Sequence, residues 1–566
     1  MLRSEPVRLD GERTRRAARR WALPLAVALV AAAWADTLRQ GFVADARFLI
    51  ADNRFLDAWS QWRATLTHDY FWSSSGASIA YWRPLTKLSW LVEARLFGRG
   101  SALPFHAVQL GWILAATAGV GVLARRLGAA AAWVALAALL FGLHPALVEA
   151  GCLLMARSDV VAVACTIWAL VGWRAWRDAE SRARAWPWAA LHLVAVVAAL
   201  GSKETAVVLP LVVTAWAWAE RPHRFATVAP AWLLTLAYLG ARAHVLGATP
   251  RAAIDPLRIF VGVGVYGWGL LPLRIATGVR NVSFAEAHGA AMLIAAAVVW
   301  AALAAGVTLA LRRRAATAIG LLALALASLL PVLVGPMPSV PGIAGKLPFA
   351  DRWLVTAAAA ASIGLVLGAA RLPLRARRLV AVVLAAWCLA AIAIAPLLHR
   401  DYKSDLTLLD REDAVYDETP ARWRTVEDRC RFGARKLARA VGSGDGDLAL
   451  QLVHDAPAEC PPDDSARFNL ASVLMQRGRF AEARPLADAL LAHYQLPPRY
   501  HAPLLYVDGV ATLRSGDAAR AEQLLTAALH EGLANCAIFA RLAEAAAAQG
   551  HRDAAASWQR RLDGCR

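Results

Sequence analysis

Charged residues are scarce in this chain of 566 residues, making up 18% of it against 58% hydrophobic residues. The mean hydropathy is +0.43. One soluble core cannot absorb so many apolar side chains, because the surface of a soluble domain has to stay polar. A wholly soluble protein is therefore excluded, and much of the chain must face lipid. Beyond Arg400, by contrast, no apolar run is long enough to cross a bilayer.

Cysteine is also rare, and the seven residues form neither a Cys-x-x-Cys pair nor a Cys/His spacing typical of a metal site. Three lie in or beside apolar runs, where a small buried hydrophobe is the simplest interpretation: Cys152, Cys165 and Cys388. The other four follow Arg400, at spacings of 30 and 29 residues: Cys430 to Cys460 and Cys536 to Cys565. These spacings indicate two local disulfides in an oxidising compartment, although four cysteines allow three pairings.

The net charge of +19 belongs to the apolar part of the chain. Residues 1–398 hold 39 Lys and Arg against 18 Asp and Glu, whereas the remaining tail holds 22 against 24. The basic residues cluster in short segments between apolar runs, which predicts that these segments are cytoplasmic. The charge therefore indicates a bilayer as partner and not a nucleic acid.

Threading the chain through these segments predicts a multi-pass membrane protein, with residues 1–20 in the cytoplasm and a membrane domain over 21–398. We expect the membrane to be a bacterial cytoplasmic membrane. Eleven spans are expected: 21–36, 105–124, 129–146, 158–173, 186–201, 204–219, 227–246, 289–311, 316–335, 353–370 and 379–398. The odd number leaves the tail outside. The apolar segment 257–273 is interpreted as re-entrant or interfacial. A cleaved signal peptide is the alternative to an uncleaved first span, but no small-residue cleavage site is obvious.

The tail contains an internal repeat. Gly478, Gly516 and Gly550 are 38 and 34 residues apart, and each is followed by an alanine four or five residues later. A repeat near 34 residues, with a helix, a glycine turn and an alanine-rich second helix, is typical of tetratricopeptide repeats. We expect a linker over 399–429 and a helical-repeat solenoid over 430–566, with an irregular helical bundle as the alternative.

Ionisable residues near membrane spans are costly, so by default they mark functional sites. In the predicted topology one set of them shares the outer face with the repeat domain. Some lie in the first outer loop, 37–104, and the others lie in the outer turns that follow. The set is Asp45, Arg83, His144, Glu149, Arg157, Asp159, Lys203, Glu204 and Arg352.

This set combines a candidate base with candidate phosphate ligands. The carboxylate of Asp45 can act as a general base towards a hydroxyl. Guanidinium forks match phosphate oxygens and lysine offers a point charge, which makes four cations candidate phosphate ligands: Arg83, Arg157, Lys203 and Arg352. The remaining members are expected to support them: His144, Glu149, Asp159 and Glu204. Basic groups beside an acid at the membrane boundary suit a lipid-phosphate donor whose tail stays in the bilayer.

Structural interpretations compete with these functional ones. Asp45 can serve as a helix cap, and Pro145 after His144 can simply end a span. The charges at Arg157 and Asp159, and at Lys203 and Glu204, can be interfacial groups or structural ion pairs. Most of the 23 tryptophans fit the aromatic belt of a membrane interface.

In their order along the chain, these motifs resemble the GT-C superfamily of lipid-linked-sugar glycosyltransferases, specifically its transmembrane-and-TPR-containing O-mannosyltransferase-like family. The matching stretches cover nearly the whole chain: Phe42-Val43-Ala44-Asp45 with Asn53, Tyr81-Trp82-Arg83-Pro84-Leu85, Leu96-Phe97-Gly98 with Phe105-His106, Phe141-x-x-His144-Pro145-x-x-x-Glu149, Arg157-x-Asp159, Ser202-Lys203-Glu204-Thr205-Ala206 and Asp351-Arg352-Trp353. The resemblance implies Asp45 as the catalytic acid residue, a sugar on polyprenyl phosphate as the donor and an inverting transfer.

The chain departs from this family at the residue after the expected base. The family often has two adjacent acids there, whereas this chain has Ala46. The departure leaves a single base and puts a scheme assisted by a divalent metal in doubt. No cofactor is firmly implied, a divalent metal stays as the disfavoured alternative, and no metal ligand is predicted.

The resulting hypothesis is an enzyme that moves a mannose-like sugar to an acceptor hydroxyl on the extracytoplasmic face. The repeat domain is expected to select an acceptor protein or glycan. The alternative is a non-enzymatic, membrane-anchored scaffold for protein partners, which has no reason to gather acids and cations on one face. A transporter is a third class, but the paired mid-span breaks expected of inverted repeats are not visible.

Overall fold

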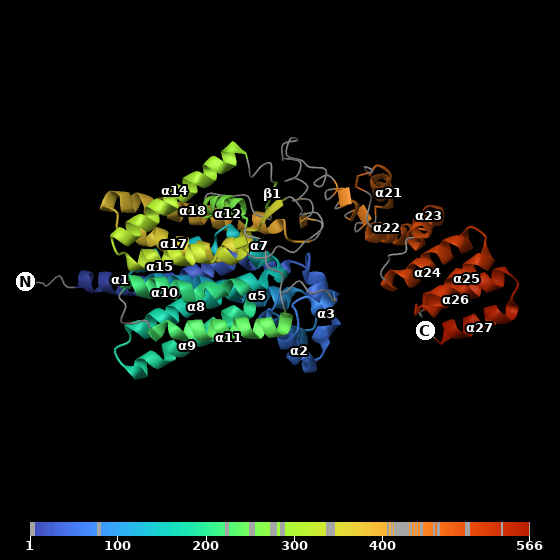
Figure 1. Cartoon of the computed structure of the whole chain (residues 1–566), viewed down its shortest axis with the longest axis horizontal. Helices are drawn as coiled ribbons and strands as arrows, with labels where there is room; N and C mark the ends of the chain where they lie inside the picture. Colours follow the sequence, from blue (N-terminus) through green and yellow to red (C-terminus); the bar gives the residue numbers. More distant parts are fainter. Residues whose placement is uncertain are drawn as a thin grey trace, which may run out of the picture. The chain divides into compact units, whose positions relative to one another are not determined.

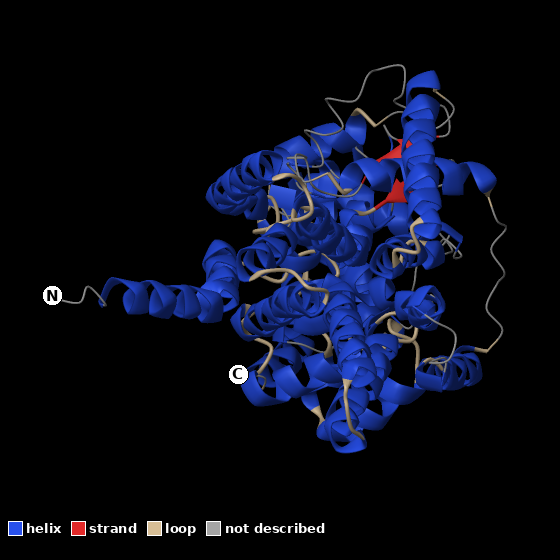
Figure 2. Cartoon of the chain, turned by 90° about the vertical axis from the view of Figure 1, so that its left-hand side faces the viewer, coloured by secondary structure: helices blue, strands red, loops and turns tan. Residues whose placement is uncertain are grey.

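The computed structural model divides the chain into two compact units, Met1–Leu408 and Leu409–Arg566 (Figure 1). It describes residues 6–75, 81–220, 226–247, 255–271, 280–283, 289–334, 346–404, 464–492, 498–533 and 536–564, together with short stretches between 407 and 460, the longest being 445–456. Helices dominate both units, as Figure 2 shows. The predicted all-α class, a membrane part followed by helical repeats, is confirmed.

The first unit is a bundle of long apolar helices joined by shorter ones. Its main helices are α1 (Pro6–Trp34), α5 (Leu103–Arg126), α6 (Ala131–Gly142), α7 (Ala146–Cys152), α8 (Arg157–Asp178), α9 (Arg182–Ser202), α10 (Leu209–Glu220), α11 (Ala229–Leu246), α12 (Pro256–Gly269), α14 (Ala290–Arg312), α15 (Ala316–Ala327), α16 (Leu330–Val334), α17 (Val355–Ala369) and α18 (Leu374–Arg400).

Within the described residues, eight helices are long and apolar enough to cross a membrane, or nine if the bent pair of α6 and α7 counts as one span. The difference from the eleven expected spans lies at α10 and α11. α10 has only 12 residues, and the 18 residues of α11 include Arg242 and His244, which lower its hydropathy. α12 has 14 residues, which is too short to cross a bilayer; it lies where the sequence predicted a re-entrant or interfacial segment.

Burial separates the central helix of the bundle from the peripheral ones. In the apolar stretch that contains α8, 89% of the residues are buried, against 6% in α14. α8 is therefore the core of the unit, packed against α5 and α9. The exposed side chains of α14, such as Ile294 and Val298, are apolar because that surface faces lipid in the membrane.

The segment between α1 and α5 folds as a compact cap with its own apolar core. It consists of η1 (Ala35–Arg39), η2 (Arg47–Ala51), η3 (Arg54–Asp57), η4 (Trp59–Gln61), α2 (Trp62–Thr67), α3 (Trp72–Ser75) and α4 (Pro84–Phe97). The carboxylate of Asp69 accepts hydrogen bonds from the backbone N–H groups of Phe71 and Tyr81, at 2.8 and 2.9 Å. Figure 1 shows α2 and α3 at the end of the bundle opposite the N-terminus.

Two short strands lie near the same end of the chain's first unit. β1 (Arg280–Ser283) pairs antiparallel with β2 (Lys346–Phe349), with Arg280 opposite Phe349. β2 leads directly into η8 (Asp351–Leu354), the short helix that carries Arg352. The pairing of the two strands thereby positions η8 and the start of α17.

The second unit is a series of antiparallel helix pairs: α21 (Gly446–His454), α22 (Asp464–Gln476), α23 (Phe480–Leu491), α24 (Pro498–Arg514), α25 (Ala518–His530), α26 (Cys536–Ala548) and α27 (Arg552–Asp563). The glycines of the repeat, Gly478, Gly516 and Gly550, have φ of 75°, 93° and 77°. This left-handed conformation costs glycine little and a side chain more. Ala483 and Ala521 are fully buried, which lets paired helices approach closely. The predicted tetratricopeptide architecture is confirmed.

Disulfides hold part of the second unit. Cys430 and Cys460 are bonded, as the spacing predicted, and Cys536 is also in a disulfide. The expected partner of Cys536, Cys565, lies outside the described residues.

Candidate functional site

Asp45 lies in the turn between η1 and η2, in the cap over the bundle. Ala44, just before it, has φ of 53°, a left-handed conformation that is uncommon for a residue with a side chain. Burial raises the pKa of the Asp45 carboxyl, while the positive charge of Arg352 lowers it. The carboxyl is therefore partly withdrawn from water and within electrostatic reach of a guanidinium that is distant in sequence.

Arg83 precedes α4 and connects the cap to the bundle. Its Nε donates to both carboxylate oxygens of Glu204, at 3.2 and 3.1 Å, and its NH2 donates to Oε2 at 3.0 Å. NH1 donates to Oγ of Ser158 at 3.2 Å. The guanidinium also lies over the rings of Tyr81 and Tyr70, 4.4 and 5.2 Å from their centroids. These contacts fix the orientation of the planar guanidinium group, which would otherwise rotate about the side-chain bonds.

Lys203 and Asp159 form a second pair. Lys203 follows α9, Asp159 is in the first turn of α8, and the ammonium donates to the carboxylate. Both residues are buried. Asp159 is the acceptor for Lys203 among the described residues, which leaves two of the three ammonium N–H groups for a ligand.

Arg352 and Glu149 form the third pair. NH1 and the backbone N–H of Arg352 both donate to the carboxylate of Glu149. Glu149 is in α7 and only 1% exposed. A carboxylate at that depth needs a cation, because an unpaired buried charge costs several kcal/mol, on the order of 3–5. α7 and η8 therefore hold each other in register through this pair.

The three pairs lie close to one another. Burial raises the pKa of the Tyr81 hydroxyl. The positive charges of Arg83 and Arg352 lower this pKa, and the negative charges of Glu204 and Asp159 raise it. One ring thus has a member of every pair within electrostatic range. Together with Asp45, the structure brings together seven of the nine residues singled out in the sequence.

Arg157 is placed differently. It is fully buried, and all parts of its guanidinium bind protein: Nε to Oε1 of Gln109 at 3.1 Å, NH1 to Glu93 and to Oγ of Ser89, and NH2 to the carbonyl oxygen of Phe105 at 2.6 Å. This arrangement joins α8 to α4 and α5. Burial raises the pKa of Glu93 to about 7, while Arg157 acts to lower it.

His144 lies two residues before the first residue of α7, Ala146. Its Nδ1 accepts the backbone N–H of Ala146 at 3.1 Å, so the proton is on Nε2, which faces the carbonyl oxygen of Leu270 at 3.4 Å. The side chain therefore fixes the start of the helix that carries Glu149, and it reaches the turn after α12.

Sequence reasoning missed Glu93, Ser158, Tyr70 and the role of Tyr81. Glu93 was recognisable, because it is an acid in an otherwise apolar stretch of α4 and such acids need a partner. Ser158 and Tyr70 carry no comparable signal in the sequence. Within the described parts of the chain, no group of three or more His, Cys, Asp or Glu side chains is arranged to hold a metal ion.

Comparison with known proteins gives one family model and two curated relatives that each match part of the chain. Residues 440–503 match the family model described as tetratricopeptide repeat. The chain is 32% identical over 186 residues, 31% of its length, to Protein O-mannosyl-transferase Tmtc2 of Drosophila melanogaster. It is 32% identical over 183 residues, 32% of its length, to Protein O-mannosyl-transferase Tmtc1 of the same organism. The predicted resemblance to O-mannosyltransferase-like proteins with repeats is confirmed.

These matches are partial. The chain's alignments span 19% and 21% of the length of the two fly proteins. Among solved structures, the chain is similar to ArnT from Cupriavidus metallidurans in the apo state, with 16% identity and a TM-score of 0.40, over 85% of this chain and 81% of that one.

Proposed function

We propose that this protein is a membrane glycosyltransferase that moves a mannose-like sugar from a polyprenyl-phosphate donor to an acceptor hydroxyl on the extracytoplasmic face. The observation that carries the proposal is the position of Asp45. Its partly buried carboxyl is within electrostatic reach of Arg352, and Arg352 belongs to a cluster with Arg83 and Lys203. A candidate base and candidate phosphate ligands therefore share one site.

In this scheme Asp45 takes the proton of the acceptor hydroxyl. The hydroxyl oxygen attacks the anomeric carbon from the face opposite the phosphate, and the bond between that carbon and the phosphate oxygen breaks. The polyprenyl phosphate leaves with the electron pair, so the anomeric configuration is inverted. The raised pKa of Asp45 makes it a stronger base than a solvated aspartate.

Arg83, Lys203 and Arg352 stabilise the charge that grows on the leaving phosphate. Donors held in place before the reaction are effective at this task, because they need no reorganisation when the charge develops. The three carboxylates paired with them hold these cations: Glu204, Asp159 and Glu149. Arg157, whose donors bind protein, joins His144 among the residues that support the site.

The geometry of the first unit also supports the proposed orientation in the membrane. The cap with Asp45 lies at the end of the bundle opposite the N-terminus (Figure 1), and basic residues end α5 and α14, at Arg125, Arg126 and Arg312. With these basic ends in the cytoplasm, the cap is extracytoplasmic. So is the C-terminal end of α18, where the His399 ring contacts the Asp36 carboxylate, and the repeat unit follows α18 along the chain. A donor on polyprenyl phosphate can then keep its chain in the bilayer while its sugar reaches the cap.

The test is transfer by the purified full chain in lipid vesicles. The protein is incubated with a panel of polyprenyl-phosphate sugars and a mixture of extracytoplasmic proteins and glycans, and release of polyprenyl phosphate is measured. We expect release with a mannose-type donor. Asp45→Asn should reduce it by at least about 100-fold, the usual loss of a general base.

Asp52→Asn is the matched control, because Asp52 is an exposed acid a few residues away in the same cap. It should leave release unchanged. Full activity in Asp45→Asn would overturn the assignment of the base. Release from none of the donors would reject the enzyme and favour a membrane-anchored scaffold.

A further inference from the structure

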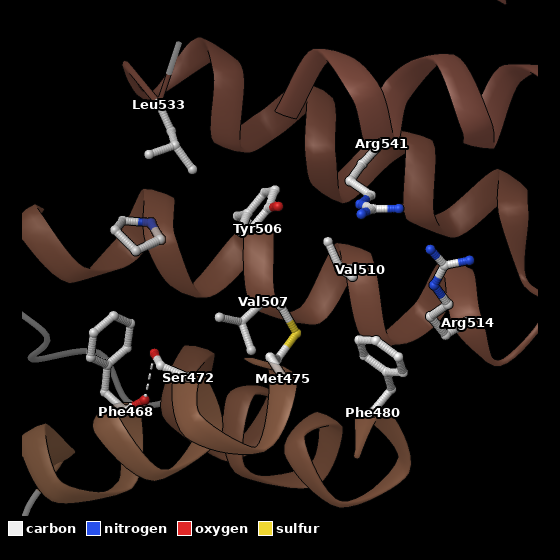
Figure 3. A pocket seen from close by; sticks show the side chains of 11 residues that line it. Phe468, Ser472, Met475, Phe480, Tyr506, Val507, Val510, Arg514, Leu533 and Arg541 are labelled. Atoms are coloured by element: carbon white, nitrogen blue, oxygen red, sulfur yellow. Dashed lines mark hydrogen bonds between the residues drawn. The ribbon is translucent and has the colours of Figure 1, made fainter. Parts of the chain in front are cut away.

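The repeat unit contains a pocket of about 390 Å³ (Figure 3). Its walls come from α22, α24 and α26, the first helices of three successive helix pairs, with Phe480 and Leu533 at the edges. The lining residues of α24 include Pro503, Tyr506, Val510 and Arg514, whose spacing of three or four residues places them on one face of the helix. The pocket is therefore a property of how the repeats stack.

Most of the pocket is apolar or aromatic. Phe468 and Met475 of α22 face Val507 and Val510 of α24 across it, beside the half-buried ring of Tyr506 (Figure 3). A hydrophobic or aromatic side chain that enters this space leaves water and gains contacts on several sides.

One end of the pocket is basic. Arg514 of α24 and Arg541 of α26 point towards one another there (Figure 3). Both bind Glu544: Arg514 NH1 donates to Oε1 at 2.5 Å, and Arg541 NH1 donates to Oε2 at 2.6 Å. Two guanidiniums thus share one carboxylate, so positive charge is in excess at this end. Arg514 also lies over the Phe480 ring, 5.8 Å from its centroid.

The arginine pair remains available to a ligand. The side chains of Arg514 and Arg541 are 39% and 35% exposed, and each guanidinium has five N–H donors. Glu544 is their hydrogen-bonding partner within the described part of the chain. Glu544 accepts from NH1 and NH2 of Arg514 and from NH1 of Arg541. The N–H groups that Glu544 does not use can bind a ligand carboxylate, which guanidiniums hold through paired hydrogen bonds.

We propose that this pocket binds an extended peptide segment in which an aromatic or aliphatic side chain stands next to an acidic residue. The apolar side chain occupies the space between α22 and α24, and the carboxylate binds Arg514 and Arg541. That such a segment belongs to the acceptor protein rests on the proposed function. The pocket would then select acceptors by a short acidic and apolar sequence near the modified hydroxyl.

The test uses the full chain in detergent and three fluorescent decapeptides in a glycine and serine background. The first contains a phenylalanine followed by two aspartates, the second replaces the aspartates by asparagines, and the third replaces the phenylalanine by glycine. Fluorescence anisotropy measures their affinities. We expect the first peptide to bind at least about tenfold more tightly than the other two, because charge-assisted hydrogen bonds and apolar burial each contribute about that much.

Arg541→Gln should remove the preference for the acidic peptide. In the unaltered chain, the affinity for the acidic peptide should fall as the salt concentration rises, because salt screens the charges. Arg560→Gln is the control, because Arg560 is an exposed arginine of α27 that does not line the pocket. Circular dichroism checks that each variant is folded. Equal binding of the acidic and amide peptides, or an unchanged preference in Arg541→Gln, would overturn the proposal.

The outcome is separable from that of the proposed function. Asp45 lies in the other unit, so the Asp45→Asn variant should bind the acidic peptide as tightly as the unaltered chain does. Binding without sugar transfer would support the pocket and reject the enzyme. Transfer without any preference for the acidic peptide would support the enzyme and reject the pocket.

Discussion

Arg83 binds both carboxylate oxygens of Glu204, a residue 121 positions further along the chain, at 3.0 to 3.2 Å. The pair connects the cap before α4 to η6 (Glu204–Val208), the turn between α9 and α10. Because the two groups match in shape, the pair fixes the direction of the guanidinium as well as its position. The cap is thereby held over the ends of α8 and α9, where Asp159 and Lys203 lie.

This geometry predicts that Arg83→Lys lowers transfer strongly although the charge is kept. Lysine offers a point charge and cannot form the two-pronged contact with Glu204 or lie flat over Tyr81. We expect a loss of at least tenfold, corresponding to about 1.4 kcal/mol of transition-state stabilisation. Steady-state rates in vesicles measure it.

Arg99→Lys is the matched control for that change. Arg99 also makes a two-pronged contact, with Asp57 at 2.8 Å for both oxygens, in the same cap. That pair is partly exposed, with Asp57 52% accessible, so its loss should cost under about 1 kcal/mol and leave transfer intact. Equal losses in the two variants would mean that Arg83 acts only by holding the cap together.

The pH dependence of transfer should report Asp45. Its carboxylate form is the base, so the rate should fall as pH decreases through its pKa. Burial raises that pKa, so the fall begins at a higher pH than for a solvated aspartate. Removing the opposing charge by Arg352→Gln should move the acid limb of the profile further upwards.

Arg352→Lys keeps a positive charge near Asp45 and should leave the acid limb close to its original pH, even if the rate is lower. Rates measured from pH 4 to pH 9 with a saturating donor distinguish the two variants. An acid limb that stays in place in Arg352→Gln would show that Arg352 does not act on the pKa of the base.

The sequence identified the members of the site but not their partners. Charges at the ends of apolar spans stand out because they are costly in a membrane, which is how Asp45, Arg83, Lys203 and Arg352 were found. Their pairing depends on residues 121, 44 and 203 positions apart. Only the packing of the helices decides such contacts, and a single sequence carries no direct record of it.

Arg157 illustrates the same limit. Its motif in the sequence looks like that of the other cations, yet packing surrounds it with Glu93, Gln109 and Ser89. The repeats of the tail were easier to predict, because the glycine turns and small alanines recur locally. The β1–β2 ladder was not predicted, since four-residue strands among long apolar runs leave no clear alternation.

The buried pair of Arg157 and Glu93 should dominate the stability of the first unit. Arg157→Met leaves Glu93 in an apolar environment without its cation, and breaking a buried pair in this way costs about 3–5 kcal/mol. We expect that loss in the free energy of unfolding in detergent micelles. Since each of the three guanidinium nitrogens of Arg157 binds protein, the folded variant should still bind the donor lipid.

Arg184→Met provides the comparison. Arg184, near the start of α9, pairs with Glu180, which precedes the helix by two residues, and the two side chains are 75% and 82% exposed. Its loss should change the free energy of unfolding by less than about 1 kcal/mol. Intact stability in Arg157→Met, with loss of donor binding, would instead return Arg157 to the phosphate ligands.

The disulfide between Cys430 and Cys460 gives a direct test of the proposed orientation. Disulfides persist in oxidising compartments, so the repeat unit should be accessible from outside intact cells. Reduction with a membrane-impermeant phosphine, followed by an impermeant maleimide, should label the second unit without disrupting the cells. Cys152, Cys165 and Cys388 are buried in the first unit and should stay unlabelled.

The double substitution Cys430→Ser and Cys460→Ser is the control for this labelling and should reduce it. The same variant should lower the stability of the second unit by roughly 2–4 kcal/mol, because the disulfide is lost. Labelling that requires permeabilised membranes would place the repeats in the cytoplasm and contradict the proposed extracytoplasmic acceptor.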